Sequence, residues 1–268
     1  MSDDLHERFR RLHDDGLFVM PNPWDIGSAR LLASLGFPAL ATTSAGLAAA
    51  LGRTDQHVTR DELVASVAAL AASVDVPLSV DAEHGYPREP GGVTATVRLL
   101  ADAGAAGCSV EDYDPVTGRI DPLEVAAERV AEAAAAAAEH GLVLTARAEN
   151  HLYGVDDLDD TIARLCAYRD AGADVVYAPG LVDRDAIARV VSETGVPVNV
   201  LLRRGGPSVS ELAALGVRRV STGGALARAA YGALVAAARE LLDAGTSTYL
   251  DAALSDEQLA AAFEAPAG

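Results

Sequence analysis

Residues 77–112 read PLSVDAEHGYPREPGGVTATVRLLADAGAAGCSVED, and this stretch decides the fold. It opens with an apolar run at 77–83 that carries acidic side chains near its end. A turn rich in glycine and proline follows, and residues 91–104 then show helical spacing and close on a glycine, as many helices do. A second apolar run occupies 107–112. This order of strand, helix and strand predicts a parallel β-α-β unit whose sheet is covered by helices.

The same pattern recurs along the whole chain. Eight apolar runs alternate with alanine- and leucine-rich helical segments. The predicted fold class is therefore α/β, with a single (β/α)8 barrel of the TIM type over residues 1–268. A dinucleotide-binding sheet is disfavoured, because the turn after the first run reads PNPWDIGS and not GxGxxG. The predicted strands are Leu17–Pro21, Ala39–Ser44, Pro77–Glu83, Gly107–Asp112, Leu142–Glu149, Asp174–Pro179, Pro197–Leu202 and Arg218–Thr222.

The end of the chain predicts an addition to the barrel. Residues from about 245 to 268 form a helical tail, with an extra amphipathic C-terminal helix in SDEQLAAAFEAPAG. This helix either packs on its own barrel or reaches a neighbouring subunit. We expect one domain, since no linker or low-complexity tract divides the chain.

The charged residues exclude several classes of function. All 21 cationic residues are arginine, so chemistry that needs a lysine amine, such as Schiff-base, pyridoxal-phosphate or P-loop chemistry, is ruled out. A net charge of −18 disfavours nucleic acid and anionic membranes as partners. An anionic substrate must therefore be attracted by a local arginine or a bound metal. Without a signal peptide, a membrane-length apolar run or closely spaced cysteines, the sequence predicts a cytoplasmic protein.

Acidic residues gather where the predicted strands end. Asp81 and Glu83 are two positions apart, so in a strand both would point to one face, and Glu111 ends the next strand. Catalytic groups of such barrels lie at these carboxyl ends. Three carboxylates without a histidine pair suit Mg²⁺, or Mn²⁺, better than zinc. The alternative is a structural network of ion pairs with arginines.

Two further features suit an anionic ligand. Arg147 lies within the strand segment TARAEN and could clamp a substrate carboxylate, although a salt bridge to Glu149 or Glu111 explains it equally well. Residues 44–46, Ser-Ala-Gly, place a hydroxyl and the amides of small residues at a strand end, where an anionic group could be cradled.

Taken in order, several motifs resemble the phosphoenolpyruvate mutase/isocitrate lyase superfamily over nearly the whole chain. The matching pieces are NPWDIGSAR, TTSAGLAAALG, LSVDAEHGY, GCSVEDYDP, TARAENHLYG, GADVVYAPG and PVNVLL. The resemblance implies Mg²⁺ chemistry on 2-oxo acids, or on 2-hydroxy acids cleaved to them, through an enolate.

The resemblance also assigns roles to residues of this sequence. Asp81 would bind the metal directly, with Glu83, Glu111 and Asp55 holding metal-bound waters. Arg147, Glu111 and Asp55 are the implied catalytic residues. The implied substrate contacts are Ser44, Ala45, Gly46, Arg147 and Asn199.

The stretch DYDPVTGRIDP at 112–122 departs from the family pattern. Lyase members carry a Lys-Lys-Cys-Gly-His loop here, and its cysteine serves as an acid, whereas this chain has neither lysine nor cysteine in the loop. The longer gating loop of the mutase is also missing. Glu83 replaces the usual second aspartate. This chain is therefore predicted to be a short-loop member that lacks the lyase cysteine motif.

We expect a Mg²⁺-dependent lyase that breaks a carbon–carbon bond in a small 2-oxo or 2-hydroxy (di)carboxylic acid. Decarboxylation is one such reaction and fits the short loop, because it needs an electron sink and no dedicated acid for a large leaving group. The alternatives are a mutase or hydrolase of carbon–phosphorus bonds, and a metabolite-binding barrel without catalysis. The resemblance also implies a homo-oligomer, a dimer or tetramer, that exchanges C-terminal helices.

Overall fold

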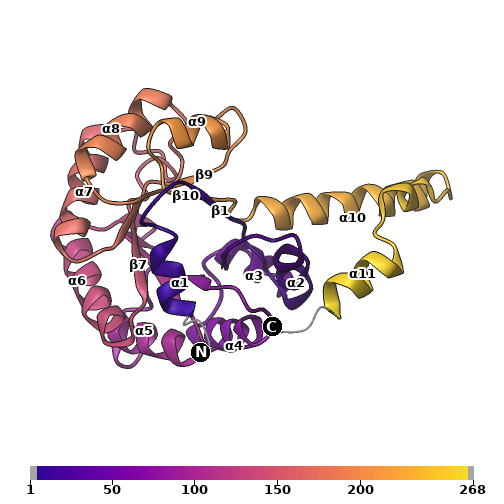
Figure 1. Ribbon diagram of the computed structural model, residues 1–268, viewed down its shortest axis with the longest axis horizontal. Coiled ribbons are helices and arrows are strands. Elements are labelled where there is room, and N and C mark those ends of the chain that lie inside the picture. The colour runs from indigo at the N-terminus through magenta and orange to yellow at the C-terminus, as the bar shows by residue number, and fades with distance from the viewer. Residues whose placement is uncertain (1–4, 265–268) are drawn as a thin grey trace.

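The computed structural model describes residues 5–264 and shows eight parallel strands arranged as a nearly closed barrel (Figure 1). The strands follow the order β1-β10-β9-β8-β7-β4-β3-β2. A hydrogen bond from Ala41 N to Pro21 O, at 3.1 Å, links the two ends of the sheet. The predicted barrel is confirmed. The strands are β1 (Phe18–Met20), β2 (Leu40–Ala41), β3 (Leu78–Asp81), β4 (Gly107–Glu111), β7 (Val143–Arg147), β8 (Val175–Tyr177), β9 (Val198–Leu201) and β10 (Arg219–Ser221).

Every predicted strand is present, and each is shorter than its predicted range. The largest difference is at β2, which was expected to reach Ser44. Instead, Thr43 caps a helix and accepts a hydrogen bond from Gly46 N, so Ser44 is already helical. A helix typically starts at a hydroxyl residue in extended conformation whose side chain accepts a hydrogen bond from an otherwise unpaired amide of the first turn. This helix start ends the strand early.

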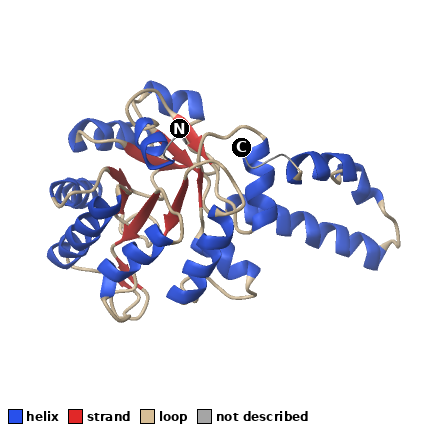
Figure 2. Cartoon of the chain, turned by 60° about the horizontal axis from the view of Figure 1, so that its bottom comes forward, coloured by secondary structure: helices blue, strands red, loops and turns tan. Residues whose placement is uncertain are grey.

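Helices surround the barrel (Figure 2). A capping box of Thr59 and Glu62 begins α4, and Gly141 in left-handed conformation ends α6. The helices are α1 (Leu5–Arg11), α2 (Ile26–Ser34), α3 (Ser44–Ala50), α4 (Arg60–Ala71), α5 (Gly92–Asp102), α6 (Leu123–His140), α7 (Leu158–Asp170), α8 (Arg184–Thr194), α9 (Val209–Ala214), α10 (Ala225–Asp243) and α11 (Asp256–Phe263), with a short 3-10 helix at Thr248–Ala252.

The loop after β4 contains a small hairpin of β5 (Tyr113–Asp114) and β6 (Arg119–Ile120). Asp114 holds this hairpin to the preceding βα loop through a bidentate ion pair with Arg88. The segment that departs from the lyase pattern is therefore a short, tethered hairpin.

The amino end of the barrel is closed by an apolar plug. Phe9 of α1 is fully buried and packs with Phe18, Met20 and Val143. Gly107 permits this contact, because a Cβ there would lie 2.6 Å from Cε1 of Phe9 and 2.7 Å from the Val143 carbonyl oxygen. With this end closed by apolar side chains, the opposite end is left for polar groups.

The C-terminal tail leaves the barrel and returns to it. In both views α10 extends away from the barrel, and α11 contacts α2 (Figures 1 and 2). Arg30 of α2 donates a hydrogen bond to the Phe263 carbonyl oxygen at 2.7 Å. The extra C-terminal helix is therefore present and packs on its own chain, while the division into domains remains a prediction. Within residues 5–264, none of the helices is long and apolar enough to cross a membrane.

The plug leads to a test of stability. Phe9→Ala should lower the free energy of unfolding by about 3–5 kcal/mol, because it leaves a cavity in a closed apolar cluster. The control is Val116→Ala, whose side chain is 73% exposed and whose effect should stay within about 0.5 kcal/mol. Urea unfolding measures both. Equal effects of the two changes would show that α1 does not close the barrel.

Candidate active site

A cavity of about 280 Å³ opens where the barrel strands end at their carboxyl sides. This volume is near the lower end of the roughly 300–1,000 Å³ common for small-ligand sites. Six of the predicted site residues line it, and three do not. The lining ones are Ser44, Ala45, Asp55, Asp81, Arg147 and Asn199, and the others are Gly46, Glu83 and Glu111.

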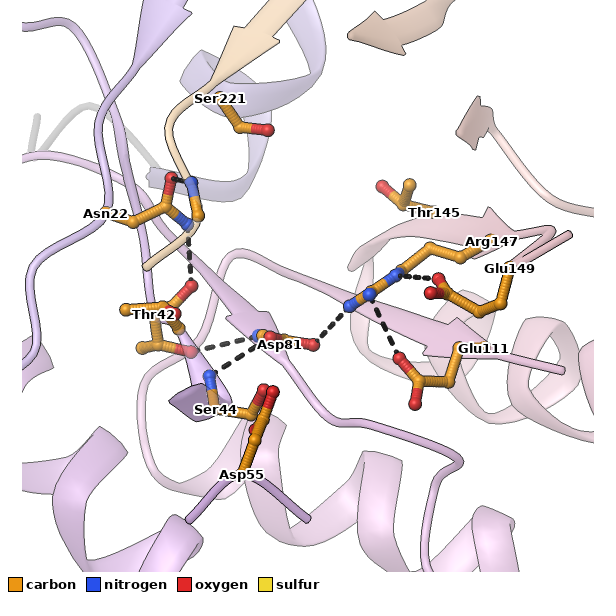
Figure 3. Close-up of polar contacts among 12 residues, drawn as sticks. Asn22, Thr42, Ser44, Asp55, Asp81, Glu111, Thr145, Arg147, Glu149 and Ser221 are labelled. Atoms are coloured by element: carbon orange, nitrogen blue, oxygen red, sulfur yellow. Dashed lines mark hydrogen bonds and ion pairs between the residues drawn. The ribbon is translucent and has the colours of Figure 1, made fainter. Parts of the chain in front are cut away.

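Arg147 is the centre of the site (Figure 3). Its Nη1 donates to Asp81 at 2.6 Å, its Nη2 lies 3.0 Å from a Glu111 oxygen, and its Nε donates to Glu149 at 2.8 Å. The guanidinium also lies over the ring of Tyr177, 5.4 Å from the ring centre. The sequence offered two interpretations of Arg147, a clamp for a substrate carboxylate and a partner in salt bridges, and its position is compatible with both. Arg147 faces the cavity, and it is also the hub of an ion-pair network.

Asp81 is fixed on three sides at the end of β3. Its backbone amide donates to Thr42 Oγ1 at 2.9 Å, and its Oδ2 accepts from the backbone amide of Ser44 at 3.0 Å. Its Oδ1 takes the hydrogen bond from Arg147. Because Thr43 starts α3 at this point, an amide of its first turn is directed at the Asp81 carboxylate. Local chain geometry therefore places Asp81 at the cavity.

Glu83 departs from the predicted strand geometry. The strand ends at Asp81, and Glu83 has a left-handed backbone with φ of 49°, so the alternation of a strand does not orient its side chain. The side chain is buried, and its Oε1 has no hydrogen-bond partner among the residues described. Burial, followed by the nearby charges of Asp81 and Asp55, raises the pKa of Glu83 to about 8. The expectation that Asp81 and Glu83 share one strand face is wrong.

Glu111 and Asp55 complete the acidic group. Glu111 is buried, and Gln56 donates to its Oε1 at 2.8 Å. Burial raises the pKa of Glu111 although Arg147 opposes the shift. Asp55 lies in the loop after α3, where burial and then the charge of Asp81 raise its pKa. Burial is thus the first cause of both shifts, and the charges of neighbouring carboxylates add to them.

Ser44, Ala45 and Gly46 do not act alike. Ser44 and Ala45 line the cavity, whereas the Gly46 amide donates at 3.3 Å to Thr43 Oγ1, the group that caps the helix. A Cβ on Gly46 would lie 2.8 Å from the Cβ of Trp24. Close packing therefore accounts for the glycine at this position.

Asn199 lines the cavity, but its amide is already engaged. Its Nδ2 donates to Ser221 Oγ at 2.9 Å, and its Oδ1 accepts from Arg219 Nε at 3.1 Å. Asn199 thus connects two side chains inside the barrel.

A buried aspartate supports the site from behind. Asp112 accepts hydrogen bonds from the Glu149 backbone amide at 2.9 Å and from the Tyr168 hydroxyl at 2.6 Å, and it pairs with Arg164 at 3.1 Å. These contacts fix the backbone that carries Glu149, and Glu149 in turn holds Arg147.

Three side chains near the carboxyl ends of the strands carry groups that could donate a proton: Tyr113, His84 and Tyr177. Tyr177 lines the cavity, and burial raises its pKa to about 12. His84 is buried beside Tyr86, and burial lowers its pKa to about 4. Tyr113 stacks on Tyr153, with ring centres 3.8 Å apart, in the loops after β4 and β7. Of the three, Tyr177 is the one that faces the cavity.

Sequence reasoning missed two residues of the site. Gln56 follows Asp55 in a loop and carries no recognisable signal, yet it bonds to Glu111. Arg219, which lines the cavity, is an arginine within an apolar strand. That signal drew attention to Arg147 and was available for Arg219 as well.

The donor chemistry fits a hard cation. Five acidic side chains belong to the site, three of them in contact with Arg147, and all are oxygen donors of the kind Mg²⁺ prefers. The unpartnered Oε1 of buried Glu83 points to a missing positive partner. Within residues 5–264, the acids do not stand as a ready-made group of metal ligands, because Arg147 contacts three of them. The five acids are Asp55, Asp81, Glu83, Glu111 and Glu149.

Barrel enzymes of this type carry their active sites at the carboxyl ends of the strands. An acidic site centred on an arginine at that end is therefore typical of a barrel enzyme that acts on small molecules. The family model described as "Phosphoenolpyruvate phosphomutase" matches residues 9–242. The chain therefore belongs to this family, within the phosphoenolpyruvate mutase/isocitrate lyase superfamily. The resemblance seen in the sequence is confirmed.

Three relatives show the range of this family. A crystal structure of a putative lyase/mutase from Burkholderia cenocepacia J2315 is 50% identical, has a TM-score of 0.93 and covers 98% of each chain. Oxaloacetate decarboxylase 2 of Pseudomonas fluorescens is 32% identical over 88% of this chain and 84% of its own. A phosphonopyruvate hydrolase solved with oxalate and Mg²⁺ is 25% identical, with a TM-score of 0.85, and covers 97% of this chain and 95% of its own.

The raised pKa of Glu83 sets a pH dependence. The folded chain keeps this proton to about pH 8, whereas an ordinary glutamate, with a pKa of 4.5, releases it earlier. Between these values the folded state binds more protons, so this carboxyl makes stability fall as pH rises, by up to about 1.4 kcal/mol per pH unit. Glu83→Gln should flatten that fall in metal-free buffer.

The free energy of unfolding, measured by urea at several pH values with a chelator present, tests this. Glu89→Gln is the control, since Glu89 is exposed. Identical pH slopes for Glu83→Gln and the unaltered protein would contradict the raised pKa.

Proposed function

We propose that this protein is a Mg²⁺-dependent lyase that breaks a carbon–carbon bond in a small 2-oxo or 2-hydroxy (di)carboxylic acid, with decarboxylation as the preferred reaction. The main support is that three carboxylates contact the single guanidinium of Arg147. The negative charge that Arg147 does not neutralise would be balanced by a dication. The short hairpin after β4 supports a reaction without a dedicated cysteine acid. Similarity to oxaloacetate decarboxylase 2 of Pseudomonas fluorescens supports the substrate class.

Asp81 would hold the metal directly, supported by Glu83, Glu111 and Asp55. Mn²⁺ suits the same donors. When bound, the ion would supply an electron sink that stabilises the enolate left by bond cleavage. The phosphonopyruvate hydrolase solved with Mg²⁺ supports a divalent ion at this kind of site.

Arg147 changes partners in this proposal. Its shortest contact is to Asp81, and once Asp81 is engaged elsewhere, Nη1 is free to donate to the carboxylate at the 2-oxo or 2-hydroxy end of the substrate. Glu149 and Glu111 keep the guanidinium in place meanwhile. The planar fork of arginine suits a carboxylate. Ser44 and Ala45, on the opposite wall, would orient the 2-oxo acid end, and Asn199 contributes a polar wall.

A second reaction is supported by one observation. The relative that was solved with oxalate and Mg²⁺ is a phosphonopyruvate hydrolase. The same site could therefore cleave a carbon–phosphorus bond, in which case phosphate and not carbon dioxide is released. A binding protein without catalysis would be stabilised by oxalate and form no product.

Activity on oxaloacetate tests the proposal. Purified protein with Mg²⁺ should form pyruvate, and Asp81→Asn should lower kcat/KM on the order of 10²–10³-fold, because the enolate charge loses its stabilisation. Asp174→Asn is the matched control, since Asp174 precedes β8 at the amino end of the barrel and pairs there with Arg10. Its kcat/KM should remain that of the unaltered protein.

The substrate panel extends to branched malates and phosphonopyruvate. Phosphate release from phosphonopyruvate alone would favour the carbon–phosphorus reaction. If Mg²⁺ and Mn²⁺ bind and no compound turns over, the lyase assignment is wrong.

We also propose a homo-oligomer, dimer or tetramer, built through the tail. Helix α10 buries just one residue, Ala227, and exposes several large apolar side chains. Partner helices would cover this face, through exchange of the C-terminal helices between subunits. A cytoplasmic location stays a prediction. The exposed side chains are Leu234, Val235, Leu241 and Leu242.

Sedimentation tests the assembly. The unaltered protein should sediment as a multiple of 27.5 kDa, and Leu234→Glu with Leu242→Glu should shift it to the monomer, because buried charge disrupts an apolar interface. Val116→Glu, on the exposed hairpin, should leave the assembly intact. A monomeric unaltered protein would remove the proposal.

A further inference from the structure

The barrel interior below the acidic site is unusually polar. Barrels of this kind are normally filled there by bulky branched side chains in layers. Here Ser79 of β3 and Ser109 of β4 line the cavity, and Thr145 of β7 lies at the same level, since Ser109 and Thr145 are register partners. Ser109 is partly exposed although it lies within a barrel strand. Small hydroxyl side chains thus leave space that continues the cavity inward from Asp81.

Arg219 of β10 lines this inner part of the cavity. The residue is 2% exposed, and its Nη2 reaches across the barrel to Thr145 Oγ1 at 2.8 Å. Its Nε donates to Asn199, and its Nη1 lies 3.4 Å from His13 Nε2. An arginine has five N–H donors, so two remain without a partner among residues 5–264.

No negative charge compensates this guanidinium within the described part of the chain. All its partners are neutral, and no salt bridge of Arg219 is present there. His13 donates from Nδ1 to the Phe9 carbonyl oxygen, so its Nε2 accepts from Arg219. Burial, and then the charge of Arg219, lowers the pKa of His13 to about 3, which keeps the ring neutral. A buried cation without a counter-ion is costly.

The other arginines at the cavity differ from Arg219. Arg147 is shared among three carboxylates, and Arg228 is exposed at the rim. Arg219 is therefore the cationic group of the cavity lining that is both buried and unpaired, as far as residues 5–264 are concerned. An anion that enters past Asp81 and binds Arg219 would gain two charge-assisted hydrogen bonds.

We propose that Arg219 binds the second carboxylate of the substrate, and that Ser79 and Ser109 provide the space for it. The site would thereby select dicarboxylic over monocarboxylic 2-oxo and 2-hydroxy acids. This inference rests on the proposed function, because it names the substrate class of the same cavity. It extends that function to an inner subsite that Arg147 and the acids do not form.

Malate and lactate form the matched pair of probes, since malate is lactate with one added carboxylate. Calorimetry with Mg²⁺ present should show that the unaltered protein binds malate more tightly than lactate. Arg219→Met should raise the Kd for malate roughly 10- to 100-fold, the usual loss for hydrogen bonds to a charged group. The Kd for lactate should not change.

Two further variants complete the test. Arg218→Met is the matched control, because Arg218 is the sequence neighbour of Arg219 and contacts Asp15 and the Gly16 carbonyl oxygen at the surface. Its preference for malate should equal that of the unaltered protein. Arg219→Gln removes the charge but keeps a donor for Thr145, so it answers the question if Arg219→Met does not fold.

The proposal is overturned if the unaltered protein binds neither acid or has no preference for malate. It is also overturned if the variants without Arg219 keep that preference, because Arg219 would then be structural. Stabilisation by chloride or phosphate alone, without a preference for malate, would assign Arg219 to a free inorganic anion instead. These experiments measure binding and not turnover. They therefore still test the role of Arg219 even if oxaloacetate does not turn over and the proposed lyase reaction is wrong.

Discussion

The architecture of this site depends on the charge balance around Arg147. One guanidinium lies among carboxylates from β3, β4 and the loop after β7, at distances of 2.6 to 3.0 Å. In a buried environment, charges interact more strongly than in water, and unpaired charge is expensive. The acids outnumber the arginine. Burial is the main cause of the raised pKa of Glu83 and of Glu111, and the charges of neighbouring carboxylates add to it. The proposed metal site and the proposed substrate contact both rest on this balance, since they use the surplus carboxylates and the guanidinium of Arg147.

Local interactions hold the charged residues around Arg147 in place. The Thr43 cap starts α3 directly behind β2, and so brings the Ser44 amide to Asp81. Asp112 holds the amide of Glu149 from the other side of the site. The apolar plug around Phe9 closes the opposite end of the barrel. The polar groups that line the cavity therefore lie at the carboxyl ends of the strands and in the interior beneath them.

Much of this was predictable from local pattern. All eight strands were found, because apolar runs between glycine-rich turns are a strong signal. Asp81, Ser44 and Arg147 were located because each is a polar residue at or near the carboxyl end of a predicted strand, and all three line the cavity. Glu83 was oriented wrongly, because the strand stops two residues before it and the backbone turns left-handed. Gly46 was given a ligand role, while its amide donates to the Thr43 hydroxyl that caps α3.

The sequence by itself determined the barrel, the set of acids, the absence of lysine chemistry and the missing cysteine loop. These follow from the order of residues along the chain. Only the tertiary structure decided that Arg147 joins Asp81, Glu111 and Glu149, and that Arg219 reaches Thr145 across the barrel without a counter-ion. The reason is physical. Alternation along a strand fixes which side a residue faces, but distances between side chains on different strands are set by the register of the closed sheet.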